Sequence, residues 1–122
     1  MKQTNLAAKK EITAALTKNL LDTIILQLLN EEDMHGYQIM TKIRKNYGIS
    51  FGPSTIYPLL TLLEKKGQLQ SAWDMKCERP RKVFKLTETG KSILAYSETA
   101  LTSFCKNFAP STNTVMMVAA HQ

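Results

Sequence analysis

Residues 51–67, with the sequence FGPSTIYPLLTLLEKKG, decide the fold that this chain is predicted to adopt. The stretch opens with Gly52 and Pro53 and closes with a cationic turn and Gly67, which are common start and stop signals of a helix. Between these signals, apolar residues recur at the helical spacing i, i+3, i+4 and i+7, and Leu62 widens the face formed by Ile56, Leu59, Leu60 and Leu63. We therefore predict a helix that starts between residues 53 and 55, which places Pro58 at the boundary of its first turn and avoids most of the cost of a proline.

The opposite face of this helix carries small or hydrogen-bonding side chains, namely Ser54, Thr55, Tyr57, Thr61 and Lys65. A helix that is buried on one side and can reach base edges and phosphates on the other suits recognition of DNA. An ordinary core helix has the same pattern, so the segments that follow have to decide between the two interpretations.

After Gly67 the period of the apolar residues changes from 3.6 to 2. Residues 69–74 and 82–86 alternate, and a polar loop that contains Pro80 joins them, which predicts a β-hairpin. Residues 76–85 hold five cations and one anion, so +4 of the net charge of +6 falls on this hairpin. This concentration directly after the candidate recognition helix favours contact with phosphates over an ordinary solvated loop. Trp73, on the first strand, is expected to pack in the core or within the wing rather than to bind a ligand.

Two further helices are predicted before this region. Residues 17–30 place apolar side chains at helical spacing, and residues 35–47 form a helix that buries Ile39, Met40 and Ile43 and ends at Gly48. His35 is expected to cap the second of these helices or to lie at the edge of the core, and Gly36 to permit close packing. Residues 1–12 fit either a short helix that leads into the next one or a frayed tail.

The last predicted helix begins after the capping residue Thr87 and runs to about residue 108. Its apolar residues spread over more surface than packing on one small domain requires, which favours a partner chain as cover. We expect dimerisation through Leu94, Leu101, Phe104 and Phe108. Residues 111–122 form a tail with an apolar patch at 115–118, expected to be disordered or docked on the dimer.

The order of elements predicts a mainly α fold with a small β-hairpin, a winged helix-turn-helix with a C-terminal dimerisation helix. The winged domain with its N-terminal helix is expected over residues 1–87, the dimerisation helix over 88–110 and the tail over 111–122. In this plan the candidate recognition helix enters the major groove and the hairpin is the wing. The pI of about 9.4 agrees with a polyanionic partner.

Other function classes have little support in the sequence. It contains no nucleophile–base pair, no clustered carboxylates and no glycine-rich phosphate loop, so we expect no catalytic residues and no enzyme activity. Neither cysteine lies in a CxxC pair or at metal-ligand spacing from a histidine, so reduced thiols, no metal and no cofactor are expected. The polar start of the chain and the short apolar runs predict a cytoplasmic protein without a membrane partner.

Four motifs resemble those of the PadR-like transcriptional regulators: HGY at 35–37, STIYPLL at 54–60, LEKKG at 63–67 and RPRKVFKLTETG at 79–90. The resemblance covers about residues 16–95. The sequence departs from the family pattern at Ser54, where a glycine is usual, and at Phe84, where a tyrosine is usual. The second departure removes a hydroxyl directed at phosphate.

The resemblance implies a homodimeric regulator, expected to be a repressor, that binds a pseudo-palindromic operator in double-stranded DNA. Some members of the compact branch of the family bind small aromatic or cationic effectors at the dimer interface, and no residue of this sequence identifies such an effector. We expect the DNA contacts to come from Ser54, Thr55, Tyr57, Lys65, Lys42, Arg79, Arg81, Lys82 and Lys85. The alternative is a winged-helix module for protein–protein assembly without specific DNA binding, which would more often have a neutral or apolar wing.

Overall fold

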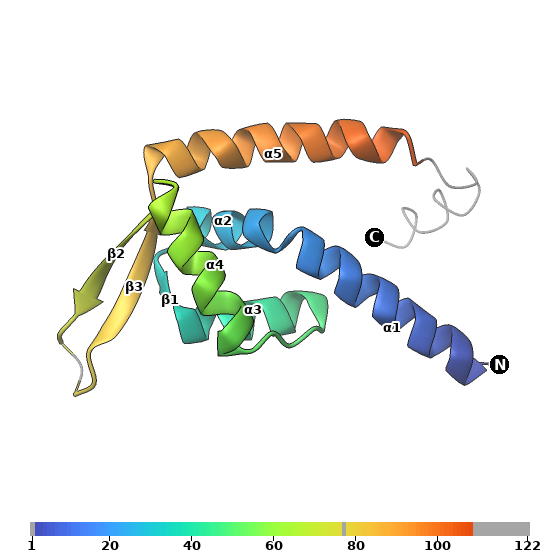
Figure 1. Cartoon of the computed structure of the whole chain (residues 1–122), viewed down its shortest axis with the longest axis horizontal. Helices are drawn as coiled ribbons and strands as arrows, with labels where there is room; N and C mark the ends of the chain where they lie inside the picture. Colours follow the sequence, from blue (N-terminus) through green and yellow to red (C-terminus); the bar gives the residue numbers. More distant parts are fainter. Residues whose placement is uncertain (1, 77, 109–122) are drawn as a thin grey trace.

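The computed structural model describes residues 2–76 and 78–108, so the expected apolar tail at 115–118 lies outside the described residues. A compact body lies between two long helices that diverge from it (Figure 1). In chain order the elements are α1 (Lys2–Asn19), α2 (Leu21–Glu31), β1 (Met34–His35), α3 (Gly36–Tyr47), α4 (Pro53–Lys65), β2 (Leu69–Asp74), β3 (Arg81–Leu86) and α5 (Glu88–Lys106).

Helix α2 lies at the centre of the body. It contacts α1, α3, α5 and β3. Its buried residues are Leu21, Ile24, Ile25, Leu26, Leu28 and Leu29, which cover more than one face of an eleven-residue helix. A helix that is apolar on several sides has to be covered on several sides, so α2 holds α1, α3, α5 and β3 together.

The predicted start of this helix at residue 17 was wrong, because residues 17–19 belong to α1. The chain bends at Leu20, and the axes of Asn5–Asn19 and Leu21–Glu31 differ by 68°. The hydroxyl of Thr17 donates to the carbonyl of Thr13 over 2.6 Å just before the break, a bond that often bends helices. In the described part of the chain no single helix is long and apolar enough to cross a membrane; these two meet that test only as a bent pair, by length and composition.

Helices α3 and α4 have the predicted bounds to within a residue. His35 is the N-cap of α3, as expected, and Gly48 ends it in the left-handed conformation at φ 73°. Helix α4 starts at Pro53, so Pro58 is its sixth residue and lies past the first turn, not at its boundary. The proline therefore leaves the Ser54 carbonyl without its helical N–H donor, and both residues are exposed to water.

The buried face of α4 is narrower than predicted. Ile56, Leu60 and Leu63 are buried and Leu59 is half-buried, but Leu62 is 44% exposed. Successive residues of a helix are turned by about 100° around its axis. Leu62 therefore points away from the buried face on which Leu60 and Leu63 pack.

The predicted hairpin is confirmed, and a third strand, β1, extends it to a three-stranded sheet. Strands β2 and β3 pair antiparallel from Leu69↔Leu86 to Asp74↔Arg81, and β1 pairs with the other edge of β3 in the order β1-β3-β2. A strand of two residues is too short to produce a period, so the sequence did not predict β1. The hairpin extends beyond the body (Figure 1), and Trp73 near its far end is 63% exposed, so of the two places expected for Trp73, the core and the wing, the core was wrong.

Helix α5 starts at the predicted cap. The hydroxyl of Thr87 accepts from the N–H of Gly90 over 3.0 Å and donates to the carbonyl of Gly67 over 2.6 Å. The first turns of α5 belong to the body, because Gly90 and Leu94 are buried there. Leu94 is thus a core residue of its own chain, and its expected place on a dimer surface has to be corrected.

We predict that Gly90→Ala destabilises the fold by about 2 kcal/mol, the usual cost of overpacking a close contact. A Cβ at this position would collide with the backbone carbonyl oxygen of Gln68 and with Leu86 Cδ1, and the backbone oxygen cannot move without breaking the junction of β2, β3 and α5. Thermal unfolding measures the loss. Thr89→Ala, at the exposed neighbouring position, should change stability by less than about 0.5 kcal/mol. Equal melting temperatures for the two variants would show that the junction adapts.

Candidate nucleic-acid interface

The first half of α4 exposes its polar side chains. Ser54 is exposed, Thr55 is half-buried and Tyr57 is 41% exposed, all within little more than one turn. Ser54 has ordinary helical backbone, so no glycine is required where the related family usually has one. The hydroxyl of Thr61 is bonded back to the carbonyl of Tyr57 over 3.0 Å. The free hydroxyl groups of this helix are therefore concentrated near its N-terminus.

Tyr57 also positions α4 against α3. A Cβ on Gly36 would lie 2.5 to 2.7 Å from Oη, Cζ and Cε1 of Tyr57, so only glycine admits this ring. The expected role of Gly36 in close helix packing is confirmed. One edge of the Tyr57 ring thus fixes the helix pair, and the exposed part faces the wing.

An open hollow of about 650 Å³, here called the wing hollow, separates α4 from the end of the hairpin. It contains three cations and three aromatic side chains, and none of its lining residues is acidic. The lining residues are His35, Gly36, Tyr37, Tyr57, Trp73, Arg79, Pro80, Arg81 and Lys82. Four of the expected DNA contacts, from α4 and from the wing, therefore meet here.

Lys82 differs from the other described wing cations because it forms an ion pair with an acidic side chain of the body. Its Nζ lies 3.7 Å from Glu64 Oε1 and 5.7 Å from the centre of the Phe84 ring. Glu64 Oε2 in turn accepts from the hydroxyl of Ser71 over 2.5 Å. Glu64 therefore ties α4 to both long strands and fixes the angle of the wing. Phe84 is buried, so its ring packs in the core.

A second hollow of about 410 Å³, the α3 hollow, lies on the other side of His35 and Arg81. Its cations are Lys42 and Lys45 of α3 together with Arg81, and Glu32 is its one acidic lining residue. Arg81 Nη1 lies 3.0 Å from His35 Nε2 and forms the wall between the two hollows. Lys42, an expected DNA contact on α3, thus lines the same hollow as Arg81 of the wing.

Four expected contacts line neither hollow: Ser54 and Thr55 lie on the first turn of α4 close to Tyr57, whereas Lys65 and Lys85 lie farther away. Lys65 is eleven residues beyond Ser54 on α4, about 16 Å along the helix axis. Lys85 pairs with Gln70 near the base of the hairpin, four residues from Arg81 and about 13 Å along the strand. Both are exposed, but the hollows do not include them.

The sequence did not assign His35, Tyr37, Lys45 or Trp73 to the site. The first two belong to the HGY motif, which could have indicated a site, but His35 was expected only to cap the helix or to lie at the edge of the core. Trp73 has the position of a core residue in the alternating pattern of its strand. Nothing in the sequence indicates that this part of the strand lies beyond the body. Lys45 resembles any cation in the last turn of a helix.

The environment of His35 lowers its pKa below 6.5, first because the ring is partly buried and second because the Arg81 guanidinium repels a proton. The described residues contain no group of three His, Cys, Asp or Glu side chains placed to hold a metal ion. The site instead offers hydrogen-bond donors, cations and aromatic faces, which suit a polyanion.

Comparisons with known proteins agree with this geometry. Residues 25–96 match the model of the family described as transcriptional regulator PadR-like. A PadR family regulator from Eggerthella lenta is 27% identical with a TM-score of 0.74, over 88% of this chain and 93% of that one. A PadR-like transcription factor from Bacteroides fragilis is 27% identical with a TM-score of 0.68, over 80% and 95%. PadR of Bacillus subtilis in complex with operator DNA is 29% identical with a TM-score of 0.58, over 62% and 45%.

We predict that acid destabilises the protein through His35. Because its pKa in the folded protein is below 6.5, the unfolded chain binds more protons as the pH falls through that value, and the free energy of unfolding decreases. His35→Asn keeps a capping side chain that does not titrate. Its melting temperature should therefore fall less than that of the wild type between about pH 7.5 and about pH 5.5. His121→Asn shows the effect of removing the other histidine, and equal falls for wild type and His35→Asn would contradict the prediction.

Proposed function

This chain belongs to the PadR-like family of transcriptional regulators, and we propose that it is a repressor that binds a pseudo-palindromic operator as a homodimer. The observation that carries the proposal is the exposed N-terminal half of α4 beside a wing hollow with three cations. A recognition helix reads base edges with its N-terminal residues, while cations next to it bind the backbone.

In this proposal Ser54 and Thr55 contact base edges and Tyr57 contacts a phosphate. Arg79 and Arg81 on the wing bind the backbone or enter the minor groove. Lys42 of α3 adds a backbone contact on the other side of Arg81, and Lys45 belongs with it because both line the α3 hollow. The ion pair with Glu64 makes Lys82 a positioning residue for the wing. Lys65 and Lys85 lie far from the hollows and contribute mainly long-range attraction.

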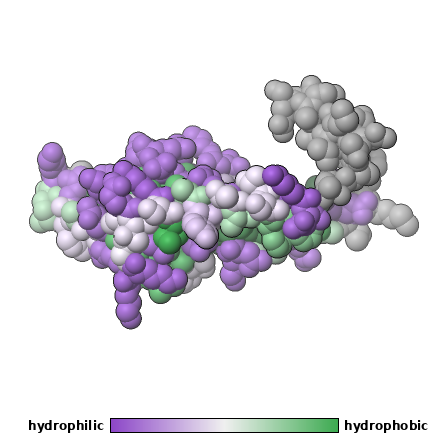
Figure 2. Space-filling model, turned by 90° about the horizontal axis from the view of Figure 1, so that it is seen from above, coloured by the Kyte–Doolittle hydropathy of each residue, from purple (hydrophilic) through white to green (hydrophobic). Residues whose placement is uncertain are grey.

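The homodimer is supported by apolar surface on the two diverging helices. On α5 and just after it, Tyr96, Phe104 and Phe108 are 60 to 80% exposed, and the rings of Phe104 and Phe108 contact each other at a tilt of 41° with centroids 5.0 Å apart. Leu6, Ile12 and Leu16 are similarly exposed on α1. Seen from the α5 side, neutral and apolar surface runs along the middle of the molecule between hydrophilic side chains (Figure 2). A second copy would remove this surface from water.

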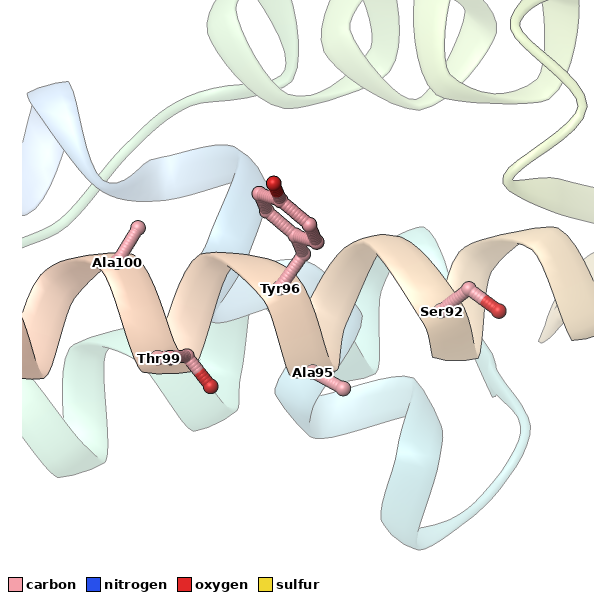
Figure 3. A pocket seen from close by; sticks show the side chains of 5 residues that line it. All are labelled: Ser92, Ala95, Tyr96, Thr99 and Ala100. Atoms are coloured by element: carbon pink, nitrogen blue, oxygen red, sulfur yellow. The ribbon is translucent and has the colours of Figure 1, made fainter.

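An effector site between the protomers is supported by a hollow on α5. Its lining residues, Ser92, Ala95, Tyr96, Thr99 and Ala100, all come from this one helix (Figure 3). The small side chains leave room beside the Tyr96 ring, so a partner helix would supply the opposite wall. A small aromatic molecule held there would change the angle between the protomers and thereby the spacing of their two α4 helices.

We predict that wing and recognition-helix variants differ in their dependence on salt. Arg79→Ala with Arg81→Ala should weaken operator and random duplex together, and should lower the slope of log K against log salt by about 0.9 for each phosphate that is no longer neutralised. Thr55→Ala should weaken the operator more than random duplex and leave the slope unchanged. Binding isotherms at several salt concentrations measure both effects.

The charge control is Lys65→Ala with Lys66→Ala, which removes two cations from the far end of α4. It should lower the slope less than the wing variant does. A wing variant with the wild-type slope would favour the protein-assembly function over DNA binding.

We predict that Phe104→Asp dissociates the dimer. Burial of an aromatic ring contributes about 1.5 to 3 kcal/mol and occurs twice in a symmetric interface, so the dimer constant should weaken at least about tenfold. Light scattering coupled to gel filtration at micromolar concentration measures it. Ser103→Asp places the same charge on the next exposed residue and should perturb the dimer less. A monomeric wild type, or a Phe104→Asp dimer of unchanged affinity, would contradict the proposal.

A further inference from the structure

The start of α3 holds the ring of His35 in one orientation. The backbone N–H of Gln38 donates to His35 Nδ1 over 3.3 Å, and the backbone N–H of His35 donates to Gln38 Oε1 over 3.0 Å. These two bonds form a capping box. A neutral imidazole has one N–H, and the nitrogen that accepts a hydrogen bond cannot carry it. The cap therefore leaves the proton of neutral His35 on Nε2.

Arg81 places a second hydrogen-bond donor next to this Nε2–H. Its Nη1 lies 3.0 Å from His35 Nε2, and a guanidinium has no acceptor. Two N–H groups cannot bond to each other, so both need an acceptor beside them. The ion pairs found among the described residues join Lys82 to Glu64 and Lys91 to Glu88, and neither involves Arg81.

The surroundings of the two donors attract an anion. The wall that they form separates the wing hollow from the α3 hollow, so a ligand can approach both groups from solvent. The charged and titratable groups that line the two hollows beside His35 are Glu32 before β1, Tyr37, Lys42 and Lys45 of α3, Tyr57 of α4, and Arg79, Arg81 and Lys82 of the wing. Five of these are cations and one is an anion.

We propose that His35 Nε2–H and an Arg81 N–H together bind one phosphate oxygen of the DNA backbone, an inference that rests on the proposed function. A phosphodiester oxygen accepts more than one hydrogen bond and carries the charge that the guanidinium needs. Helix α3 is the first helix of the helix-turn-helix, the one that crosses the backbone. The contact would join α3 and the wing to the same phosphate and so fix the depth of α4 in the groove without reading a base.

A double-mutant cycle on a random-sequence duplex tests whether the two side chains share one phosphate. His35→Asn keeps a strong capping residue but lacks the Nε2–H donor. Arg81→Gln removes the guanidinium. Each single substitution should weaken binding about tenfold, the usual loss of a hydrogen bond to a charged group. The double variant should bind at least about threefold more tightly than the product of the two losses predicts, because the donors depend on each other.

The matched control is the cycle of His35→Asn with Lys85→Gln, a cation further along the same strand. These losses should multiply, because the two residues do not share a ligand. His35→Asn should also leave the salt slope unchanged, since a neutral donor releases no counterion, whereas Arg81→Gln should lower it by about 0.9 for each phosphate that the guanidinium neutralises in the wild type.

The position of the proton is tested on the free protein by two-bond ¹H–¹⁵N correlation NMR at a pH above the histidine pKa. His121→Gln identifies which of the two histidines gives each signal. An Nε2–H ring is expected. An Nδ1–H ring would accept from Arg81 and overturn the inference, as would single losses that multiply in the His35–Arg81 cycle. A wild type that binds no duplex at low salt would overturn the proposed function as well, which separates the two failures.

Discussion

Burial of α2 is the constraint on which the rest of the structure depends. Six of its residues are buried, and they lie on more than one side of the helix, so no single neighbouring element can cover them. The chain covers them with α1, α3, α5 and the central strand β3. Burying an aliphatic side chain contributes about 1.5 to 3 kcal/mol, which makes this cluster the largest identifiable source of stability in the body. Helix α3 and strand β3 are therefore placed by their contacts with α2, whereas α4 is placed by its contacts with α3 and β2.

Two local interactions convert this packing into a defined interface. Gly36 has no side chain, so the ring of Tyr57 can lie against the start of α3 and set the angle between the two helices. Glu64 binds Ser71 and Lys82, which sets the angle between α4 and the wing. The hairpin is thus held to α4 at Ser71 and Lys82, while its loop end extends past the body. Trp73, Arg79 and Arg81 are exposed there for that reason, and they remain available to a ligand.

The two long helices differ in how far they depend on a partner. Helix α5 begins inside the body, where Gly90 and Leu94 are buried and Gln27 donates to Glu98 over 3.0 Å. Its later turns and most of α1 leave the body with apolar side chains in water (Figure 1). The body therefore completes its own core, while the proposed dimer would complete the surfaces of α1 and α5. A regulator built in this way can change the distance between its two recognition helices without unfolding either body.

The sequence by itself determined the elements whose signals are local. The apolar period with Gly52 and Gly67 predicted α4, the capping residues predicted the starts of α3 and α5, alternation predicted β2 and β3, and four motifs indicated the family. Only the tertiary structure decided the bend at Leu20, the pairing of β1, and the exposure of Leu62 and Trp73. It also brought His35 to Arg81, 46 residues further along the chain. Periods and caps depend on neighbours within a few residues, whereas exposure and long-range contacts depend on which faces the other elements cover, and that is settled only when the core packs.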